Sequence, residues 1–130
     1  MFDHISIGVS DLTRASAIYE AALEPLGLTP LWRSERAVGF GPPGFVGEAP
    51  FAIVVPKAGT ANPSRAAHIA FRADSRAAVQ AFHAQAVAAG ARDDGPPGIR
   101  DHYDAGYYAA FVQDLDGNRI EAVFHELAGP

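Results

Sequence analysis

Three residues of the chain have side chains that divalent metals accept as ligands. His4 opens the segment HISIGV, His68 opens the similar segment HIAF, and Glu121 lies in the middle of NRIEAVFH. Taken singly, each residue is more typical of a hydrogen-bonded or solvent-exposed side chain than of a ligand. Two imidazoles and one carboxylate together form the donor set of open divalent sites, which leave one metal face for a substrate. The three residues therefore predict a metal centre with an accessible face.

The polar and aromatic segment IRDHYDAGYYAAF is expected to border this centre. It gathers Arg100, His102, Tyr103, Tyr107 and Tyr108 within nine positions. Histidine and tyrosine can transfer protons, and arginine can clamp an anion. The alternative is that the tyrosines pack at the edge of the domain and that the histidine is solvated.

The turn DLDGN decides which tyrosine shares a strand face with Glu121. An Asp-Gly pair between the strand patterns YYAAFV and RIEAVF predicts a hairpin. A three-residue loop ending at a left-handed Gly117 pairs Glu121 with Phe111 and places Tyr107 on the same face. A two-residue turn would place Tyr108 there instead. We favour the three-residue loop.

An internal repeat supplies the elements that must position these residues. Residues 4–27 and 68–90 each run from a short alternating strand into a helix and then a glycine, with His4 and His68 set 64 residues apart. In HISIGV the alternating apolar residues send His4 and Ser6 to the opposite strand face. A polar N-cap precedes each helix, at Ser10 or Asp11 in the first copy and at Ser75 in the second.

Shorter extended segments complete each copy, and the GPPG tracts at 41–44 and 95–98 predict loops. The extended segments are expected at about 29–34, 37–41, 51–55, 106–113 and 118–125. The pattern predicts an α+β chain that forms β-α-β-β-β twice in one domain, 1–130. Module one would cover 1–56, a linker 57–64, and module two 65–130.

Composition narrows the class of protein. At 130 residues and 48% hydrophobic, the chain suits one compact core. The net charge of −5 comes without a run of Lys or Arg, so neither nucleic acid nor an anionic membrane is an expected partner. The absence of cysteine excludes disulfides and thiolate metal sites. Because the strand pattern begins at His4, we expect no signal peptide and a cytoplasmic protein.

These segments resemble the vicinal oxygen chelate superfamily, which includes glyoxalases, extradiol dioxygenases, fosfomycin-modifying thiol transferases and bleomycin resistance proteins. The resemblance covers the whole chain and rests on HISIGVSD with its helix, on HIAF, and on FVQDLDGNRIEAV. The last segment is similar to the family's Asp-Pro-Asp-Gly turn, with Leu115 in place of proline. The resemblance implies paired modules whose curved mixed sheets enclose a metal cavity, with His4, His68 and Glu121 at the ligand positions. The two-His, one-Glu donor set would accept one divalent ion, Fe, Mn, Zn, Co or Ni. The resemblance also implies a homodimer.

Membership of such a family leaves the reaction open. Lactoylglutathione lyases use a further carboxylate ligand on the last strand of the first module, and FAIVV at 51–55 has no acid. Glu48 lies just upstream and would have to reach the metal from a loop. The two-His, one-Glu pattern is more similar to extradiol dioxygenases and fosfomycin thiol transferases.

The hypothesis from the sequence is a metal-dependent lyase, dioxygenase or transferase that acts on a small oxygen-bearing substrate by bidentate chelation. Tyr107, Tyr103 or His102 would act as acid or base. Substrate contacts are expected from residues of both modules, namely Ser6, Trp32, Phe40, Arg100 and Phe111. The alternatives are a metal-independent drug- or toxin-binding resistance protein and a fosfomycin-type thiol transferase.

Overall fold

A computed structural model describes residues 1–127 of the chain. Each half contains one α-helix and four strands, and the first half adds a 3₁₀ turn, η1. In chain order the elements are β1 (Ile5–Gly8), α1 (Leu12–Leu23), η1 (Glu24–Leu26), β2 (Thr29–Arg33), β3 (Ala37–Gly41), β4 (Phe51–Val54), β5 (His68–Arg72), α2 (Arg76–Ala88), β6 (Arg92–Ile99), β7 (Tyr107–Gln113) and β8 (Arg119–His125).

The strands form two four-stranded sheets of identical topology. The first sheet has the order β1-β4-β3-β2 and the second the order β5-β8-β7-β6. In each sheet the first and last strands of the module pair in parallel, and the other neighbours pair antiparallel. The structure therefore confirms the predicted duplication of a β-α-β-β-β unit.

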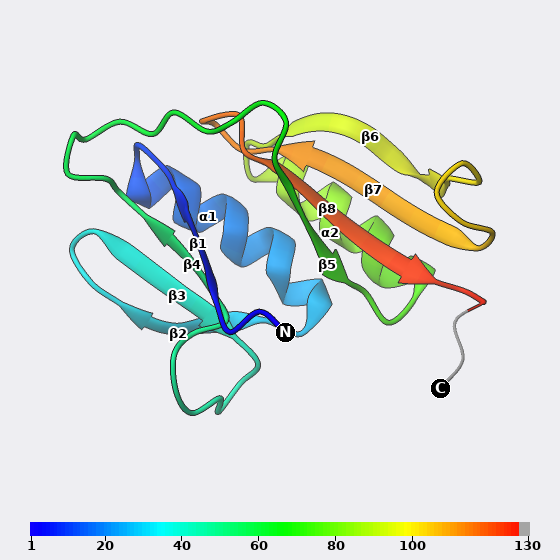
Figure 1. The fold of residues 1–130 in the computed structure, drawn as a ribbon, viewed down its shortest axis with the longest axis horizontal. Helices are drawn as coiled ribbons and strands as arrows, with labels where there is room; N and C mark the ends of the chain where they lie inside the picture. Colours follow the sequence, from blue (N-terminus) through cyan, green and yellow to red (C-terminus); the bar gives the residue numbers. More distant parts are fainter. Residues whose placement is uncertain (128–130) are drawn as a thin grey trace.

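The two sheets lie side by side, and both helices cover the same side of them (Figure 1). The helices pack against each other, and the apolar strand faces complete one core around residues such as Tyr19, Phe40 and Phe82. The opposite side, which we call the open face, carries no helix in either sheet. Within residues 1–127, the two four-stranded sheets remain separate and do not close around a cavity.

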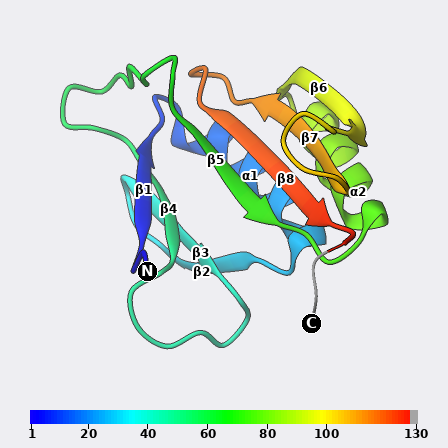
Figure 2. The same ribbon diagram turned by 45° about the vertical axis from the view of Figure 1, so that its right-hand side comes forward.

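Strands β1 and β5 are the adjoining edges of the two sheets, and they run in opposite directions (Figures 1 and 2). At one end of this seam, Gly8 of β1 lines a pocket with His68. At the other end, Ile5 lines a second pocket with Arg72. The seam therefore brings the start of each strand to the end of the other.

Both helices begin at the predicted caps. The Asp11 carboxylate accepts from the Arg14 amide at 3.1 Å, and the Ser75 hydroxyl oxygen accepts from the Ala78 amide at 3.0 Å. After α1, Gly27 adopts a left-handed φ of 78° that ends the helical segment. These contacts fix the two helices at equivalent positions in the repeat.

The prediction that the second GPPG tract forms a loop is wrong. The tract lies within β6, which pairs with β7 at the edge of the second sheet. Proline lacks an amide donor, but an edge strand needs donors on only one side. Register shifts on either side of Gly95, whose φ is 149°, let the strand pass over the prolines. The first GPPG tract does form a turn after β3.

The β7–β8 turn is tied to the first module by a buried polar network. The Asp114 carboxylate accepts from the Tyr19 hydroxyl at 2.7 Å and from the Asn118 side-chain amide at 2.8 Å. Asn118 also donates to the Gly8 carbonyl at 2.8 Å, and Ser10 donates to Asp116 through its hydroxyl at 2.5 Å. The network fixes the start of β8 against α1 and the end of β1.

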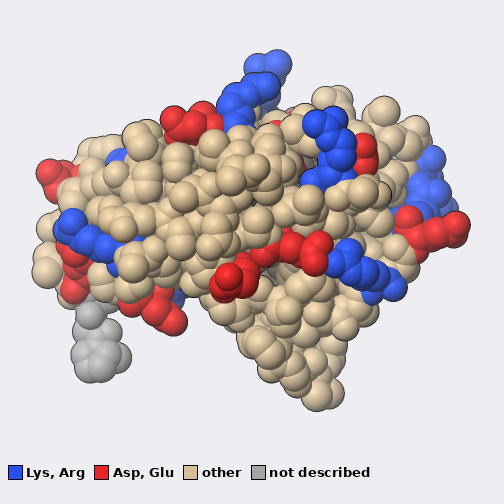
Figure 3. Space-filling view, turned by 180° about the vertical axis from the view of Figure 1, so that it is seen from behind, with Lys and Arg blue, Asp and Glu red and all other residues tan. Residues whose placement is uncertain are grey.

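The helix-covered surface carries charges of both signs, scattered among uncharged residues (Figure 3). No single-sign patch dominates this face, as expected for a chain without a basic run. Within residues 1–127, no helix is both long enough and apolar enough to cross a membrane.

Candidate metal and substrate site

Glu121 is the centre of the candidate site. It lies in the middle of β8 on the open face, yet its exposed fraction is only 1%. Its Oε1 lies 3.2 Å from the Nε2 of His68, and its Oε2 accepts a short hydrogen bond from the Tyr107 hydroxyl. A carboxylate buried to this degree requires cationic or hydrogen-bonding partners, because desolvating an unpaired charge is costly.

His68 provides the accessible side of the pair. It begins β5, which runs parallel to β8 with Ala70 opposite Glu121, so the histidine reaches the carboxylate diagonally. The His68 side chain is 43% exposed, and its ring centroid lies 6.3 Å from that of Phe111. The pair thus joins an exposed imidazole nitrogen to a buried carboxylate oxygen, and both atoms are of the kind that bind metals.

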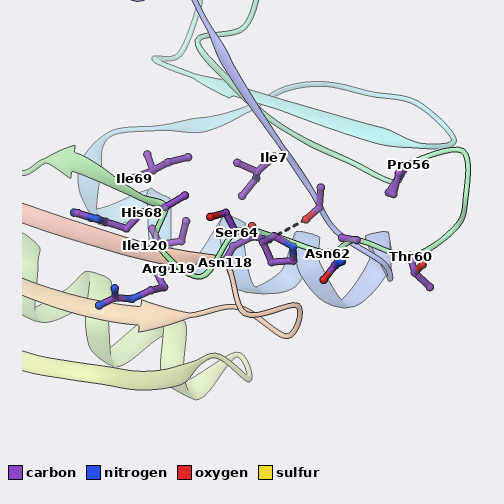
Figure 4. Close-up of a pocket in the computed structure, with 14 residues that line it drawn as sticks. Ile7, Pro56, Thr60, Asn62, Ser64, His68, Ile69, Asn118, Arg119 and Ile120 are labelled. Carbon is purple, nitrogen blue, oxygen red and sulfur yellow. Dashed lines mark hydrogen bonds between the residues drawn. The ribbon is translucent and has the colours of Figure 1, made fainter.

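His68 also borders a pocket of about 370 Å³ at the seam between the modules (Figure 4). The linker residues Thr60, Asn62 and Ser64 form one wall, and Ile7 of β1 lies across from them. The predicted linker is therefore part of the surroundings of His68.

His4 does not join His68 and Glu121 within one chain. Its Nδ1 lies 2.6 Å from Asp3 Oδ2, and this hydrogen bond raises the pKa of the exposed histidine. His4 immediately precedes β1, and His68 begins β5. Because these two strands run in opposite directions (Figure 2), the two histidines lie at opposite ends of the seam. Residues 1–127 contain no group of three or more His, Cys, Asp or Glu side chains placed to hold a metal ion.

Tyr107 lies on the open face beside Glu121, as the three-residue turn predicts. Gly117 has a left-handed φ of 89°, and Phe111 pairs with Glu121. Burial, followed by the hydrogen bond to Glu121, raises the pKa of the Tyr107 hydroxyl. The ring meets His125 edge-on with centroids 5.2 Å apart. The second tyrosine of the pair, Tyr108, faces the helices instead.

Tyr103 and His102 extend this aromatic cluster toward solvent. The Tyr103 ring lies 5.0 Å from that of Tyr107, and the His102 ring lies 4.3 Å from that of Tyr103. Tyr103 is 55% exposed. In the described residues, the hydrogen-bonding and ionic partners of Glu121 are Tyr107 and His68, so Tyr103 and His102 join the site only through the Tyr107 ring.

Arg100 lies across the open face over the Phe111 ring, with its guanidinium carbon 5.5 Å from the ring centroid. One guanidinium nitrogen donates to the Pro96 carbonyl at 2.7 Å. A Cβ at Gly95 or Gly98 would approach the guanidinium to 3.2 or 3.1 Å, so these glycines make room for the arginine. Among residues 1–127, no carboxylate lies within 4 Å of Arg100.

The remaining predicted substrate residues belong to the first sheet. Ser6 and Trp32 lie on its open face, where the indole covers Gly39 so closely that a Cβ there would meet it at 2.4 Å. Phe40 faces the helices instead and is fully buried, with its ring 6.5 Å from that of Tyr19. Phe40 therefore lies in the core, away from the other predicted site residues.

Sequence reasoning missed one contact near Glu121 and one space beside Arg100. The alternation of β8 already places His125 on the strand face of Glu121, but it did not reveal that His125 contacts the Tyr107 ring. The space that Gly95 and Gly98 leave for Arg100 was hidden because their tract suggested a loop. A glycine that bends an edge strand has the same sequence signal as a glycine in a loop, so the GPPG tract alone does not distinguish the two.

Comparisons with known proteins agree with this architecture. Residues 1–122 match the family model of the Glyoxalase/Bleomycin resistance protein/Dioxygenase superfamily. A glyoxalase/bleomycin resistance protein from Albidiferax ferrireducens T118 is 32% identical, with a TM-score of 0.82, and 95% of this chain and 98% of that chain are covered.

Two more distant structures share the fold. A glyoxalase-related enzyme from Fulvimarina pelagi is 24% identical, with a TM-score of 0.71 over 95% of this chain and 87% of that chain. The fosfomycin resistance protein FosX from Mesorhizobium loti is 20% identical, with a TM-score of 0.65 over 98% and 93%. No curated protein matches the chain.

The fold and the open-face pair of His68 and Glu121 define a protein with two β-α-β-β-β modules and an accessible polar site. The chain belongs to the glyoxalase/bleomycin resistance protein/dioxygenase superfamily.

Proposed function

We propose that the protein is a divalent-metal-dependent enzyme that acts on a small oxygen-bearing substrate. The observation that carries this proposal is the buried Glu121 carboxylate held 3.2 Å from the exposed His68 imidazole. An imidazole nitrogen and a carboxylate oxygen are donors that Fe, Mn, Zn, Co and Ni all accept. A divalent ion bound there would act as a Lewis acid on two substrate oxygens.

The third ligand is His4 of the partner subunit in a homodimer. Within one chain, His4 immediately precedes β1 of the first sheet and shares the strand face of Ser6 by alternation, whereas His68 and Glu121 lie on the open face of the second sheet. Two copies related by a twofold axis can lay the first sheet of each across the second sheet of the other. This arrangement would cover both open faces and create two equivalent sites per dimer.

The chain's own residues prepare the site for substrate. The Tyr107 hydroxyl donates to one oxygen of Glu121 and leaves the other oxygen directed at His68. Tyr107 is also the group that we assign to proton exchange with a bound substrate, and its ring packs against Tyr103, which in turn packs against His102. Arg100, without a carboxylate partner in the described chain, supplies a cation beside Phe111. Trp32 and Ser6 would form the opposite wall.

The proposal is tested by metal uptake in two single variants and in their mixture. Wild-type protein should bind about one divalent ion per chain, and both His4→Ala and His68→Ala should lose tight binding. When the two variants are co-expressed, random pairing restores a complete ligand set at about a quarter of the sites. His83→Ala is the matched control, because His83 bonds to Asp93 away from the site.

Each outcome decides between specific models. Recovery of about a quarter of the sites in mixed dimers supports a ligand set shared between chains. Loss of binding in both variants without recovery contradicts the shared set. Undiminished metal affinity in His68→Ala overturns the metal site itself. If every metal-loaded form is inert toward catechols, α-oxoaldehyde–thiol adducts and epoxides, but the metal-free protein binds one of them, the protein is a binding protein.

A further inference from the structure

A row of polar side chains crosses the open face of the second sheet at the level of His68. His68 pairs with Arg119, Arg119 with Gln113, and Gln113 with Arg92. Because directly paired residues share a sheet face, all four side chains lie on the side that carries Glu121. The row therefore begins at a proposed metal ligand and ends at an arginine on the edge strand.

The far part of this row opens into a polar pocket of about 450 Å³. The linker contributes Asn62 and the start of the second module contributes Arg65, and both line the pocket together with Arg92 and Arg119 of the sheet. The β7–β8 turn closes one end. Three arginines from three separate segments thus surround one pocket, together with the amide of Gln113.

The acidic groups of the pocket leave two of these cations without a carboxylate partner. Arg119 pairs with Asp94, at 3.0 Å between Nε and Oδ2. The Asp116 carboxylate is held by the amide and hydroxyl of Ser10, at 3.0 and 2.5 Å. In the described part of the chain, no carboxylate lies within 4 Å of Arg65 or Arg92.

Asp114 also borders the pocket, but its oxygens face inward. They accept hydrogen bonds from Tyr19, from the side chain of Asn118, and from backbone amides of the turn. The Asp114 side chain is therefore committed to the buried network between the modules. Guanidinium groups bind oxyanions through paired N–H donors, and the two unpartnered arginines provide such donors here.

We propose that this pocket, the arginine pocket of Arg65, Arg92 and Arg119, binds an oxyanion carried by the substrate at the end remote from its chelating oxygens. Phosphate and carboxylate share the required chemistry. The link to the metal site rests on the proposed function, since Arg119 precedes Glu121 by two residues, or about 7 Å along the strand. Neighbouring strands add about 4.8 Å each, so Arg92 lies roughly 14 Å from His68. The substrate would therefore be an extended molecule with one anionic arm.

The test measures anion binding to the metal-free, full-length protein. Inorganic phosphate and succinate are titrated separately, and amide chemical shifts around Arg92, Gln113 and Arg119 are followed by NMR. Arg92→Gln and Arg65→Gln should each weaken the preferred anion about tenfold, as expected when one charged hydrogen-bond donor is lost. Arg33→Gln is the control, because Arg33 pairs with Glu20 in the other module.

A further variant separates this proposal from the metal proposal. Glu121→Gln should abolish metal binding but leave phosphate or succinate affinity within twofold of wild type. A response to phosphate alone assigns a phosphorylated substrate, and a response to succinate alone assigns a carboxylate. Equal weakening by Arg33→Gln, or shifts spread evenly over the surface, would overturn the arginine pocket as an anion site.

Discussion

His68 and Glu121 approach to 3.2 Å on the open face of the second sheet, and the carboxylate shares its other oxygen with the Tyr107 hydroxyl. The pair joins one accessible metal-ligand group, the His68 imidazole, to one buried metal-ligand group, the Glu121 carboxylate. A metal ion can reach the exposed imidazole from solvent, whereas the buried carboxylate is held in one position by its packing. A site made of two rigid strands is positioned more accurately than one made of loops.

Substituting Glu121 should separate metal binding from folding. Glu121→Gln keeps an oxygen acceptor for Tyr107 but removes the negative charge, so metal affinity should fall by more than about 100-fold. The metal-free variant should remain folded, because the amide fills the same buried space. Elemental analysis measures the metal content of the variant. A thermal melt followed by circular dichroism shows whether the variant remains folded. Wild-type metal content in this variant would contradict the assignment of Glu121 as a ligand.

Tyr107 should affect turnover more than metal binding. Tyr107→Phe removes the hydroxyl that contacts Glu121 but keeps the ring that packs against His125 and Tyr103. Turnover should drop by about 10²- to 10⁴-fold, the usual effect of losing a proton-transfer group, while metal content stays unchanged. The matched control is Tyr108→Phe, since Tyr108 faces α2 and bonds to Gln80. Equal losses in both variants would indicate a structural effect only.

The local geometry of the site follows from sequence because it depends on neighbouring residues. An Asp-Gly turn with a left-handed glycine fixes the β7–β8 register, and this register places Tyr107 and Phe111 beside Glu121. The alternation of β1 likewise sends His4 and Ser6 away from the core. Each of these inferences spans fewer than about twenty residues and uses one periodicity.

The relation between the modules could not be obtained in the same way. The repeat shows that β1 and β5 are equivalent, but equivalence under a twofold axis leaves their direction and separation open. In the structure they meet antiparallel, which places His4 and His68 at opposite ends. The sequence did not predict β6 for a different reason. Pairing with β7 outweighs the preference of the GPPG tract at 95–98 for a turn.

The buried contact between Tyr19 and Asp114 should contribute to the stability of the whole domain. The hydroxyl donates to the carboxylate at 2.7 Å and joins α1 to the β7–β8 turn, 95 residues away. Tyr19→Phe removes this donor with little change in volume, so the free energy of unfolding should fall by about 1 to 3 kcal/mol. Urea denaturation measures the difference. An unchanged midpoint and slope would show that the remaining donors to Asp114 suffice.

The same tyrosine should make stability depend on alkaline pH. Burial, together with the nearby Asp114 carboxylate, raises the pKa of the Tyr19 hydroxyl well above its usual value. The folded state therefore keeps the neutral phenol while the unfolded chain ionises near pH 10. The Tyr19 contribution is present below about pH 10 and is lost as the pH rises further. Between about pH 9 and pH 11, the free energy of unfolding should therefore fall less in Tyr19→Phe than in the wild-type protein. An equal fall in the two proteins would contradict this assignment.

Trp32 and Gly39 pair across β2 and β3, and this contact shapes the open face of the first sheet. A Cβ at position 39 would lie 2.4 Å from the indole, so Gly39→Ala must displace the ring. Trp32 is the single tryptophan and is already 40% exposed, which allows it to swing toward solvent. The variant should show red-shifted emission, stronger quenching by acrylamide, and a loss of about 1 to 3 kcal/mol in unfolding free energy.

Gly8→Ala provides the matched glycine control for this experiment. Gly8 ends β1 in the same sheet, but an added Cβ would meet Ala61 at 3.3 Å rather than the tryptophan. Its emission spectrum should therefore remain that of wild type. If Gly39→Ala also keeps the wild-type spectrum and stability, Trp32 does not cover Gly39 in solution. The indole would then be free to take another position on the face that the proposed partner subunit covers.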